Sequence, residues 1–446
     1  MNRNVILFAS FKSFLVLLIF SAIAFETHGV QITLSPDPAG ACPALQQALA
    51  SAQPGDILRL SPGVYRELLL ITNSGGEGKN ITIRGEGRVV FSGEGKSLAG
   101  QDRQALIRIE NAHHVRLEGL ELTNLKSDQK GVVPVGILVT GASGDLELVN
   151  LDIHHIETLF PEKNGGDAHG LAVYGNQPVE PIRNILIDRV RIHDCKLGSS
   201  ESMVLNGNVE AFTVQNCEIH DNNNIGIDFI GHEKVCKTPE LDQARKGVCR
   251  SNLVYNISSY GNPAYGNDRS ADGIYVDGGK DILIEHNTVT NCDIGIEIAS
   301  EHRNQEVSDV IVRGNSVSQS FQAGIMMGGY SAGRGSATRI TIENNILTEN
   351  DRARWNMGEL VFQWHVSQSK IIGNTFYPRV QYDAACYISR SSKAVETTNI
   401  VFDGNTYILA GKRQQWSLSK DQVANNFADW QKLGHDRNGL LKAASP

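Results

Sequence analysis

The sequence predicts an all-β solenoid built from short parallel strands, and two recurring phrases are the basis of this prediction. One phrase alternates apolar residues and ends in an asparagine, recurring about every 30 residues. Its asparagines are Asn252, Asn287, Asn315, Asn345, Asn374 and Asn405. The other phrase is a small residue followed by alternating apolar positions, as in Gly273-Ile-Tyr-Val and Gly295-Ile-Glu-Ile. Short strands repeated at this period favour coils that stack at the sheet spacing of about 4.8 Å.

The asparagine positions have a physical reason in such a stack. One amide per coil lies above the next, so the amides can hydrogen-bond along the axis and satisfy the backbone of the turns. Upstream of Asn252 the same frame holds Cys217, Val190 and Leu151. The coils therefore continue toward the N-terminus with an apolar residue in that position.

A short helix is expected at each end of the solenoid. Residues 43–52 form an amphipathic segment that is stopped by Pro54 and Gly55. Near the C-terminus, Ser419 and Gln422 have the spacing of a capping box, which predicts a helix that begins there and ends at Gly434. These helices would cover the open edges of the first and last coils.

Composition and the N-terminal segment restrict the class of protein. The 446 residues include 41 Lys and Arg against 49 Asp and Glu, a formal net charge of −8. This balance argues against nucleic-acid binding. Residues 1–25 have a charged start, a short apolar run and small residues at Ala22 and Ala24, as a signal peptide does. We therefore expect a secreted, periplasmic or cell-envelope monomer with no stable membrane insertion after signal cleavage.

A family resemblance sharpens the predicted fold. The segments Leu45-Gln-Gln-Ala-Leu, Ala52-Gln-Pro-Gly-Asp-Ile-Leu-Arg-Leu and Pro62-Gly-Val-Tyr resemble the opening of secreted pectin-lyase-like proteins. The following coils resemble right-handed parallel β-helix repeat proteins. The resemblance implies a single-stranded right-handed parallel β-helix over 30–410, with a C-terminal cap over 411–446. It also implies a carbohydrate-active protein, often a polysaccharide lyase and sometimes a glycoside hydrolase or epimerase.

Candidate site residues gather on the middle coils. In the aligned repeats, Asp228 and Glu297 flank Tyr275 in one outward-facing column, and Asp277 lies beside Tyr275. The neighbouring coils carry apolar residues in the first column, so the polar group is local. Further candidates follow at the same strand ends: His232, Lys280, Glu301 and His302.

These residue types suit two ways of cleaving a polysaccharide. For β-elimination on an acidic, uronate-containing glycan, Lys280 or Tyr275 would move protons, while Asp228, Asp277 and Glu297 would orient the sugar or bind Ca²⁺. For hydrolysis, Asp277 and Glu297 would be the acid and the base or nucleophile. We expect the lyase slightly ahead of the hydrolase.

Two observations limit the resemblance to pectate lyases. The chain has no clustered Asp-Asp motif at these strand ends, and Lys280 is the only lysine close to the candidate group. The pectate-lyase mechanism is therefore not transferred residue by residue. A non-catalytic glycan-binding envelope protein that uses the same surface is a third interpretation.

The long polar interruption between Asp228 and Gly273 adds substrate-binding candidates. Arg245, Arg269 and Asp272 lie in it, and the two arginines can bind acidic groups of a glycan or brace the loop internally. Cys236 and Cys249 bracket part of this segment and could close it as a disulfide.

Two histidine patterns also admit two interpretations. His169 and Glu201 form a cross-coil pair that either extends the site or makes an ordinary hydrogen bond. The column His154, His193 and His220 resembles a metal site, but a stacked ladder of rings is the favoured interpretation. Because the histidine column is interpreted as a ring ladder, calcium is the only cofactor that we expect. The expected partner is a polysaccharide or oligosaccharide substrate.

Overall fold

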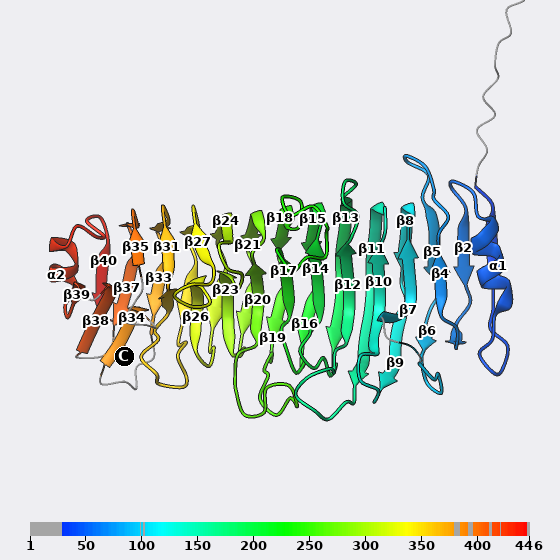
Figure 1. The fold of residues 1–446 in the computed structure, drawn as a ribbon, viewed down its shortest axis with the longest axis horizontal. Helices are drawn as coiled ribbons and strands as arrows, with labels where there is room; N and C mark the ends of the chain where they lie inside the picture. The colour runs from blue at the N-terminus through cyan, green and yellow to red at the C-terminus, as the bar shows by residue number, and fades with distance from the viewer. Residues whose placement is uncertain are drawn as a thin grey trace, which may run out of the picture.

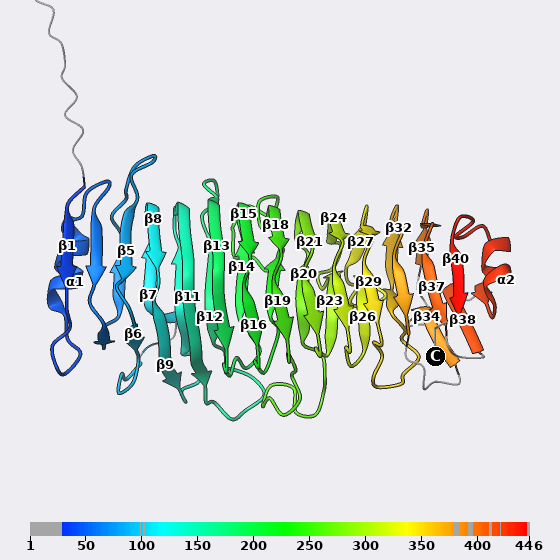
Figure 2. The same cartoon turned by 180° about the vertical axis from the view of Figure 1, so that it is seen from behind.

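The chain folds as a parallel β-helix, as predicted. This computed structural model describes residues 29–98, 100, 103–378, 384–390, 396–409, 413–419 and 421–443. The coils stack into an elongated solenoid of about 11 turns (Figures 1 and 2). The long loops of the middle coils project from one edge of the stack, which is the lower edge in Figure 1.

Two sheets form the walls of the solenoid, a sheet of 27 strands (sheet A) and a sheet of 13 strands (sheet B). The strands of sheet B are β4 (Leu69–Ile71), β7 (Arg103–Glu110), β10 (Val133–Thr140), β12 (His169–Gly175), β14 (Met203–Gly207), β17 (Ile227–Ile230), β20 (Asp272–Asp277), β23 (Ile294–Ser300), β26 (Ala323–Gly329), β30 (Leu360–Gln363), β34 (Ala384–Arg390), β38 (Arg413–Ser419) and β39 (Gln422–Ala424). Those of sheet A are β1 (Gln31–Leu34), β2 (Ile57–Leu60), β3 (Gly63–Tyr65), β5 (Ile81–Gly85), β6 (Val89–Ser92), β8 (His113–Glu118), β9 (Glu121–Ser127), β11 (Gly144–Thr158), β13 (Ile182–His193), β15 (Val209–Gln215), β16 (Glu218–His220), β18 (Ala244–Arg250), β19 (Leu253–Tyr255), β21 (Lys280–Glu285), β22 (Thr288–Thr290), β24 (Glu306–Arg313), β25 (Ser316–Ser318), β27 (Ser336–Thr338), β28 (Thr341–Glu343), β29 (Ile346–Thr348), β31 (His365–Ser367), β32 (Lys370–Ile372), β33 (Thr375–Tyr377), β35 (Glu396–Thr398), β36 (Val401–Asp403), β37 (Thr406–Leu409) and β40 (Leu440–Ala443).

The core lies between the two sheets and is apolar because alternate residues of most strands point inward. In β20, Ile274 and Val276 join the main apolar core, whereas Tyr275 between them does not. The recurring small residue is needed where each coil enters sheet B. At Gly295 a Cβ atom would lie 2.3 Å from the carbonyl oxygen of Gly324 on the next coil.

The predicted asparagine ladder is confirmed. From Asn252 to Asn374, the backbone N–H and the side-chain amide of each asparagine donate to Oδ1 of the next, at 2.9–3.0 Å. The ladder ends at Asp436, which accepts from Asn405 at 2.8 Å and from the Tyr407 hydroxyl at 2.6 Å. These bonds satisfy buried turn groups in successive coils.

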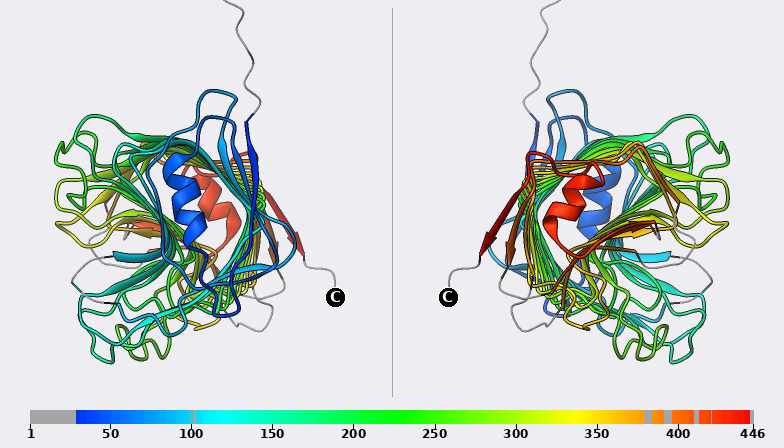
Figure 3. Two further views of the ribbon diagram at one scale, coloured as in Figure 1. Left: turned by 90° about the vertical axis from the view of Figure 1, so that its right-hand side faces the viewer. Right: turned by 90° about the vertical axis from the view of Figure 1, so that its left-hand side faces the viewer.

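The N-terminal cap agrees with the prediction and the C-terminal cap differs from it. Helix α1 (Pro43–Ser51) and helix α2 (Phe427–Lys432) lie across the two ends of the stack (Figure 3). The predicted capping box at Ser419 is wrong, because that segment pairs as the antiparallel hairpin β38–β39. Asn426 caps α2 instead, with its side chain accepting from the N–H of Asp429. Strands β38 and β40 also continue the two sheets beyond residue 410.

The cysteines do not form the suggested bridge. Cys236 and Cys249 are both buried free thiols, so the loop is not closed by a disulfide. The Cys236 thiol instead donates to the carbonyl oxygen of Gln177 at 3.3 Å. The signal-peptide prediction for residues 1–25 lies outside the described residues. Within the described residues, none of the helices has the length and hydrophobicity that a membrane span requires.

Candidate active site

The structure confirms the register that brought the candidate acids together. Asp228 pairs with Tyr275, and Tyr275 pairs with Glu297, on the adjacent strands β17, β20 and β23. The segment between β17 and β20 adds no strand to sheet B between them, because β17 pairs directly with β20. We name the outward-facing carboxyls of these coils the acid row: Asp228, Asp272, Asp277, Glu297 and Glu301.

Apolar side chains border the acid row on both sides along the same face. Upstream, Ala172 and Val204 occupy the column of Asp228 and are fully buried. Downstream, Met326 and Val361 continue the column beyond Glu297. Both groups form small clusters separate from the main core. Among the described residues, the acids on the outer face of sheet B that form no ion pair thus gather in its middle.

Glu297 and Asp272 form a hydrogen-bonded pair of carboxyl groups. The side-chain amide of Gln363, from β30, donates to Oε1 of Glu297 at 2.9 Å. Burial, above all, raises the pKa of Glu297 to about 7 and that of Asp272 well above its ordinary value. A pair of this kind holds a proton at neutral pH, which general acid catalysis requires.

Asp277 and Tyr275 are tied to Glu301. The backbone N–H of Glu301 donates to Oδ1 of Asp277 at 3.1 Å, which favours the ionised carboxylate. Burial and the nearby Glu301 charge oppose this and raise the pKa of Asp277 well above its ordinary value. Tyr275 shares a hydrogen bond with Glu301, and burial raises its pKa well above its ordinary value. Tyr275 is therefore a neutral hydrogen-bond donor.

Asp228 connects the acid row to the predicted pair His169 and Glu201. Burial, followed by the charge of Glu201, raises the pKa of Asp228 well above its ordinary value. Burial also raises the pKa of Glu201 to about 8. His169 lies with Nδ1 3.2 Å from the Glu201 carbonyl oxygen and Nε2 3.3 Å from the Tyr174 hydroxyl. Because burial lowers the pKa of His169 to about 3, this histidine is a neutral hydrogen-bonding group.

His232 and His302 lie together near Glu301. Their ring centroids are 6.4 Å apart, and Nε2 of His302 is buried without a hydrogen-bond partner among the described residues. Burial lowers the pKa of His232, and its Nε2 lies 2.9 Å from the Gln243 amide nitrogen. His302 is thus the histidine of the pair with a free ring nitrogen close to the acid row.

Three predicted cationic residues are not brought into the acid row. Lys280 begins β21 in sheet A, is exposed, and pairs in register with Arg245 and Ser308. Arg245 donates to Asn208 at 2.9 Å and pairs with Glu210 at 3.1 Å. Arg269 pairs with the buried Asp293 at 3.2 Å. The bracing interpretation therefore holds for both arginines, although the partner of Arg245 is a glutamate.

Comparison with known proteins identifies the family to which the fold belongs. The family model for the right-handed β-helix region matches residues 69–332 and 272–429. The chain belongs to this family. This result also confirms the handedness and the resemblance that the sequence suggested. An uncharacterized Bacillus subtilis (strain 168) protein, YwoF, is 39% identical over 333 residues, which cover 74% of this chain and 69% of YwoF.

Solved structures with the same β-helix fold include proteins that act on or bind glycans. A mannuronan C-5 epimerase module of Azotobacter vinelandii, AlgE6, gives a TM-score of 0.52 at 14% identity, covering 91% of this chain and 94% of that one. The lacto-N-biosidase of Eubacterium ramulus gives 0.51 at 13% identity, covering 85% and 68%. The tailspike of E. coli bacteriophage HK620, solved with a hexasaccharide, gives 0.52 at 13% identity, covering 82% and 61%. Similarity at this level shows the fold.

The metal expectations have different outcomes in this β-helix. His154, His193 and His220 stack with ring centroids 4.9 Å apart, which confirms the ring ladder, and Tyr255 extends it. Within the part of the chain that the structure describes, no group of three or more His, Cys, Asp or Glu side chains is arranged to hold a metal ion. Calcium binding by Asp228, Asp277 and Glu297 stays a prediction.

Arg103 and Tyr174 are site residues that the sequence analysis did not select. The Arg103 guanidinium lies 3.7 Å from the Tyr174 ring centroid, next to the His169–Glu201 pair. Both residues line a hollow of about 220 Å³ on the face of sheet B. The residues that pair with Tyr174 on the adjacent strands are Thr140 and Asn206, which gave no sign of chemistry in the sequence. Arg103 comes from β7, two strands upstream of Tyr174 in sheet B, so its approach required the folded register.

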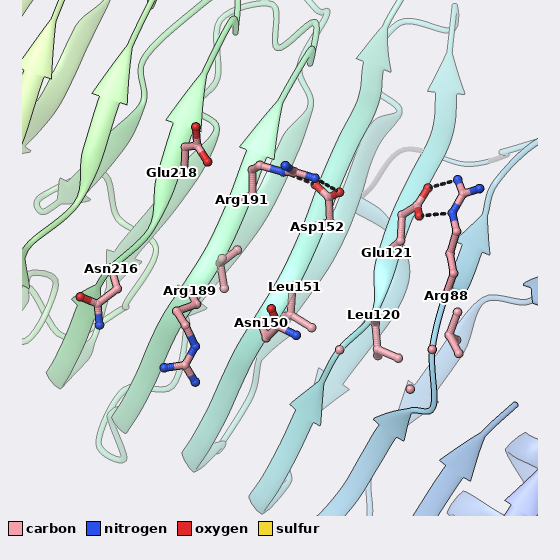
Figure 4. A pocket seen from close by; sticks show the side chains of 15 residues that line it. Arg88, Leu120, Glu121, Asn150, Leu151, Asp152, Arg189, Arg191, Asn216 and Glu218 are labelled. Carbon is pink, nitrogen blue, oxygen red and sulfur yellow. Dashed lines mark hydrogen bonds and ion pairs between the residues drawn. The ribbon is translucent and has the colours of Figure 1, made fainter. Parts of the chain in front are cut away.

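A larger hollow of about 670 Å³ lies on sheet A, away from the acid row. Figure 4 shows its charged side chains pairing across neighbouring strands, Arg88 with Glu121 and Arg191 with Asp152. Because these charges neutralise one another on the scaffold, we place the candidate chemistry on sheet B. Among the described residues, Asp228, Asp272, Asp277 and Glu297 form no ion pair there, and Glu301 is the acid of the row that the Arg334 charge reaches.

Proposed function

We propose that this protein hydrolyses a glycosidic bond of a glycan at the acid row. The observation that carries the proposal is the hydrogen-bonded pair of half-buried Glu297 and buried Asp272, in which the pKa of Glu297 is about 7. At neutral pH the pair shares a proton, which Glu297 can donate to the leaving oxygen of the scissile bond.

Asp277 is the base in this scheme. Asp277 takes a proton from an attacking water in its ionised form, which the N–H of Glu301 favours and burial opposes, so this step gains as the pH rises toward the raised pKa of Asp277. Asp277 lies one coil and two residues away from Glu297, because it pairs with Ala299. One sheet spacing and two residues along a strand separate their backbones by about 8 Å. Both an inverting and a retaining arrangement of the two carboxyl groups are compatible with this backbone separation.

Hydrolysis fits this surface better than the β-elimination that the sequence favoured. Elimination next to a uronate needs a cationic group to stabilise the charge that develops on the sugar. Lys280, one of the two residues expected to move protons in the elimination, is exposed on the other sheet. A uronate placed over the acid row would instead meet Glu297, Asp277 and their neighbours. The related folds that act on or bind glycans support glycan recognition on a β-helix, and export through residues 1–25 fits an extracellular substrate.

The test is the mass of the products. The mature protein is incubated with neutral and acidic polysaccharides, and the oligosaccharides are analysed by mass spectrometry. We expect saturated products, each one water heavier than the product of elimination. Unsaturated products would establish a lyase and return attention to Tyr275. No product from any glycan would favour the glycan-binding protein.

A further inference from the structure

Exposed aromatic side chains gather beside the acid row. Among the residues that the structure describes, Tyr260, Tyr330 and Trp355 are the aromatic residues with more than half of their surface exposed, at 54%, 55% and 56%. Each lies on a loop that enters or leaves a strand of sheet B, between β19 and β30. The other large apolar side chains with high exposure are aliphatic.

Tyr260 and Trp355 belong to one continuous stack. The Arg269 guanidinium lies over two rings, 4.5 Å from the centroid of Tyr260 and 4.7 Å from that of Phe321. Phe321 meets Trp355 edge to face at 5.6 Å. The stack passes from the loop before β20 to the loop before β30, three strand spacings or about 14 Å along sheet B. We name these four residues the aromatic strip.

The aromatic strip is held in place from beneath. Arg269 is fixed by Asp293, whose other oxygen accepts from the N–H of Ser259 at 2.8 Å. Asp293 directly precedes β23, the strand of Glu297. The Trp355 loop is ordered by Asp351, which accepts the N–H of Trp355 at 2.9 Å. The strip is therefore connected through Asp293 to the strand that carries Glu297, and its rings are held by hydrogen bonds and an ion pair of the protein itself.

The opposite edge of sheet B carries a second ring. The Arg334 guanidinium lies 4.3 Å from the Tyr330 ring centroid, and its Nε donates to the carbonyl oxygen of Glu301 at 2.9 Å. Aromatic rings with adjacent hydrogen-bonding groups thus stand on both sides of the acids.

We propose that the aromatic strip is a binding platform for a glycan of uncharged sugar rings, on which the sugars stack while the chain passes over the acid row. The inference rests on the proposed function and specifies its substrate class. The apolar C–H faces of pyranose rings gain from contact with aromatic faces, and exposed rings held rigid lose little entropy on binding. The ionised carboxyls of the acid row repel uronates, sulfated sugars and phosphorylated sugars, and the protonated carboxyls offer no opposite charge to bind them.

Affinity gel electrophoresis tests this inference without depending on turnover. Glu297→Gln protein is run through native gels that contain xylan, galactomannan, mixed-linkage β-glucan or soluble starch, and through gels with sodium alginate or polygalacturonate. We expect one neutral polysaccharide to retard the protein. In this background Trp355→Ala and Tyr260→Ala should each weaken retardation by about tenfold, whereas Trp355→Phe should retain most of it. Ile346→Ala, an exposed apolar residue on sheet A, is the matched control.

Each alternative result has a defined meaning. Retardation by the acidic polymers alone, by none of the polymers, or with undiminished strength in Trp355→Ala and Tyr260→Ala overturns the aromatic platform. Thermal melting of each variant separates loss of binding from loss of fold. If binding depends on the strip but the unmodified protein yields no product, then the proposed hydrolysis fails and the platform stands.

Discussion

The two sheets of this protein treat outward-facing charge in opposite ways. On sheet A, acids and bases alternate from coil to coil, as in Arg313 with Glu285 at 2.6 Å and Arg339 with Asp309 at 2.7 Å. On sheet B, the acid row has no such cations within it, and burial raises the pKa of its carboxyls. Both sheets are built from parallel strands of the same stacked coils. The repeat itself therefore does not require that their outward-facing charges differ.

This contrast distinguishes scaffold from site. Paired charges on neighbouring strands contribute modestly to stability, and this contribution is enough to explain why they are there. Buried carboxyls that repel one another cost stability, and such groups concentrate where a protein performs chemistry. The following predictions test whether the two sheets differ in this way.

The largest expected effect is on catalysis. Glu297→Gln should reduce glycan cleavage by about 10³-fold, because an amide cannot donate the proton that the leaving group needs. Glu285→Gln on sheet A should leave the rate unchanged. Rates are measured from reducing ends released from the polysaccharide found to be cleaved. Equal rates in the two variants would remove Glu297 from the mechanism.

The amide ladder gives the largest expected effect on folding. Asn315→Ala leaves the buried N–H of Asn287 without its acceptor and removes the amide that donates to Asn345. We expect a loss of about 3 kcal/mol in the free energy of unfolding, measured in urea. Asn291→Gly, at an exposed asparagine that is bonded to Asn256 and has a positive φ that glycine adopts without strain, should change it by about 0.5 kcal/mol or less. A similar small change in Asn315→Ala would contradict a structural role for the ladder.

The pH dependence of kcat should show the pKa of Glu297, the proposed general acid. Because Glu297 must be protonated and its pKa is about 7, the rate should fall about tenfold per pH unit above neutrality. The Gln363 amide stabilises the ionised form, so Gln363→Ala should move this limb to higher pH. An unchanged limb in Gln363→Ala would assign the titration to another group.

Removing an acid from the row should stabilise the fold. The raised pKa of folded Asp228 means that its ionised form favours the unfolded chain, so stability declines as pH rises from about 4 toward the folded pKa. Asp228→Asn should therefore gain about 1–2 kcal/mol at pH 8 and nothing at pH 4. Urea unfolding at both values measures the gain. Destabilisation at pH 8 would show that Asp228 serves the scaffold.

The smallest expected effect is a loss of stability, opposite in sign to the gain expected for Asp228→Asn. Glu285→Gln removes one member of a half-exposed ion pair with Arg313. We expect a loss of about 0.5 kcal/mol in the free energy of unfolding, reduced further in 1 M salt. Thermal melting at two salt concentrations measures it. A gain in stability in Glu285→Gln would contradict the view that outward-facing charges stabilise sheet A and destabilise sheet B.

The sequence was sufficient for the fold and for much of the register. The period of the asparagines and of the small residues identified the solenoid, and the aligned columns placed Asp228, Tyr275 and Glu297 on neighbouring strands. This worked because a one-residue slip would turn an apolar side chain out of the core. The C-terminal helix was placed too early because a capping pattern competed with pairing to β38, and the pairing won.

Lys280 shows what the register could not decide. It follows Asp277 by three residues, yet the tight turn at Gly278 places it on the other sheet. The partners of Arg245 and Arg269 likewise depend on how the loops fold back. Loops have no repeat to align. Their sequence spacing therefore does not predict which residues their side chains contact in the folded protein.

The sequence by itself therefore determined the solenoid, its axis and the order of side chains along each column, because hydrophobic periodicity and stacked amides are local and repeated. Only the tertiary structure decided which acids lose their water, which pairs share a proton and which aromatic rings stand beside them. Those properties depend on loops from separate coils closing over one face, and burial by distant segments is what changes the chemistry of a carboxyl group.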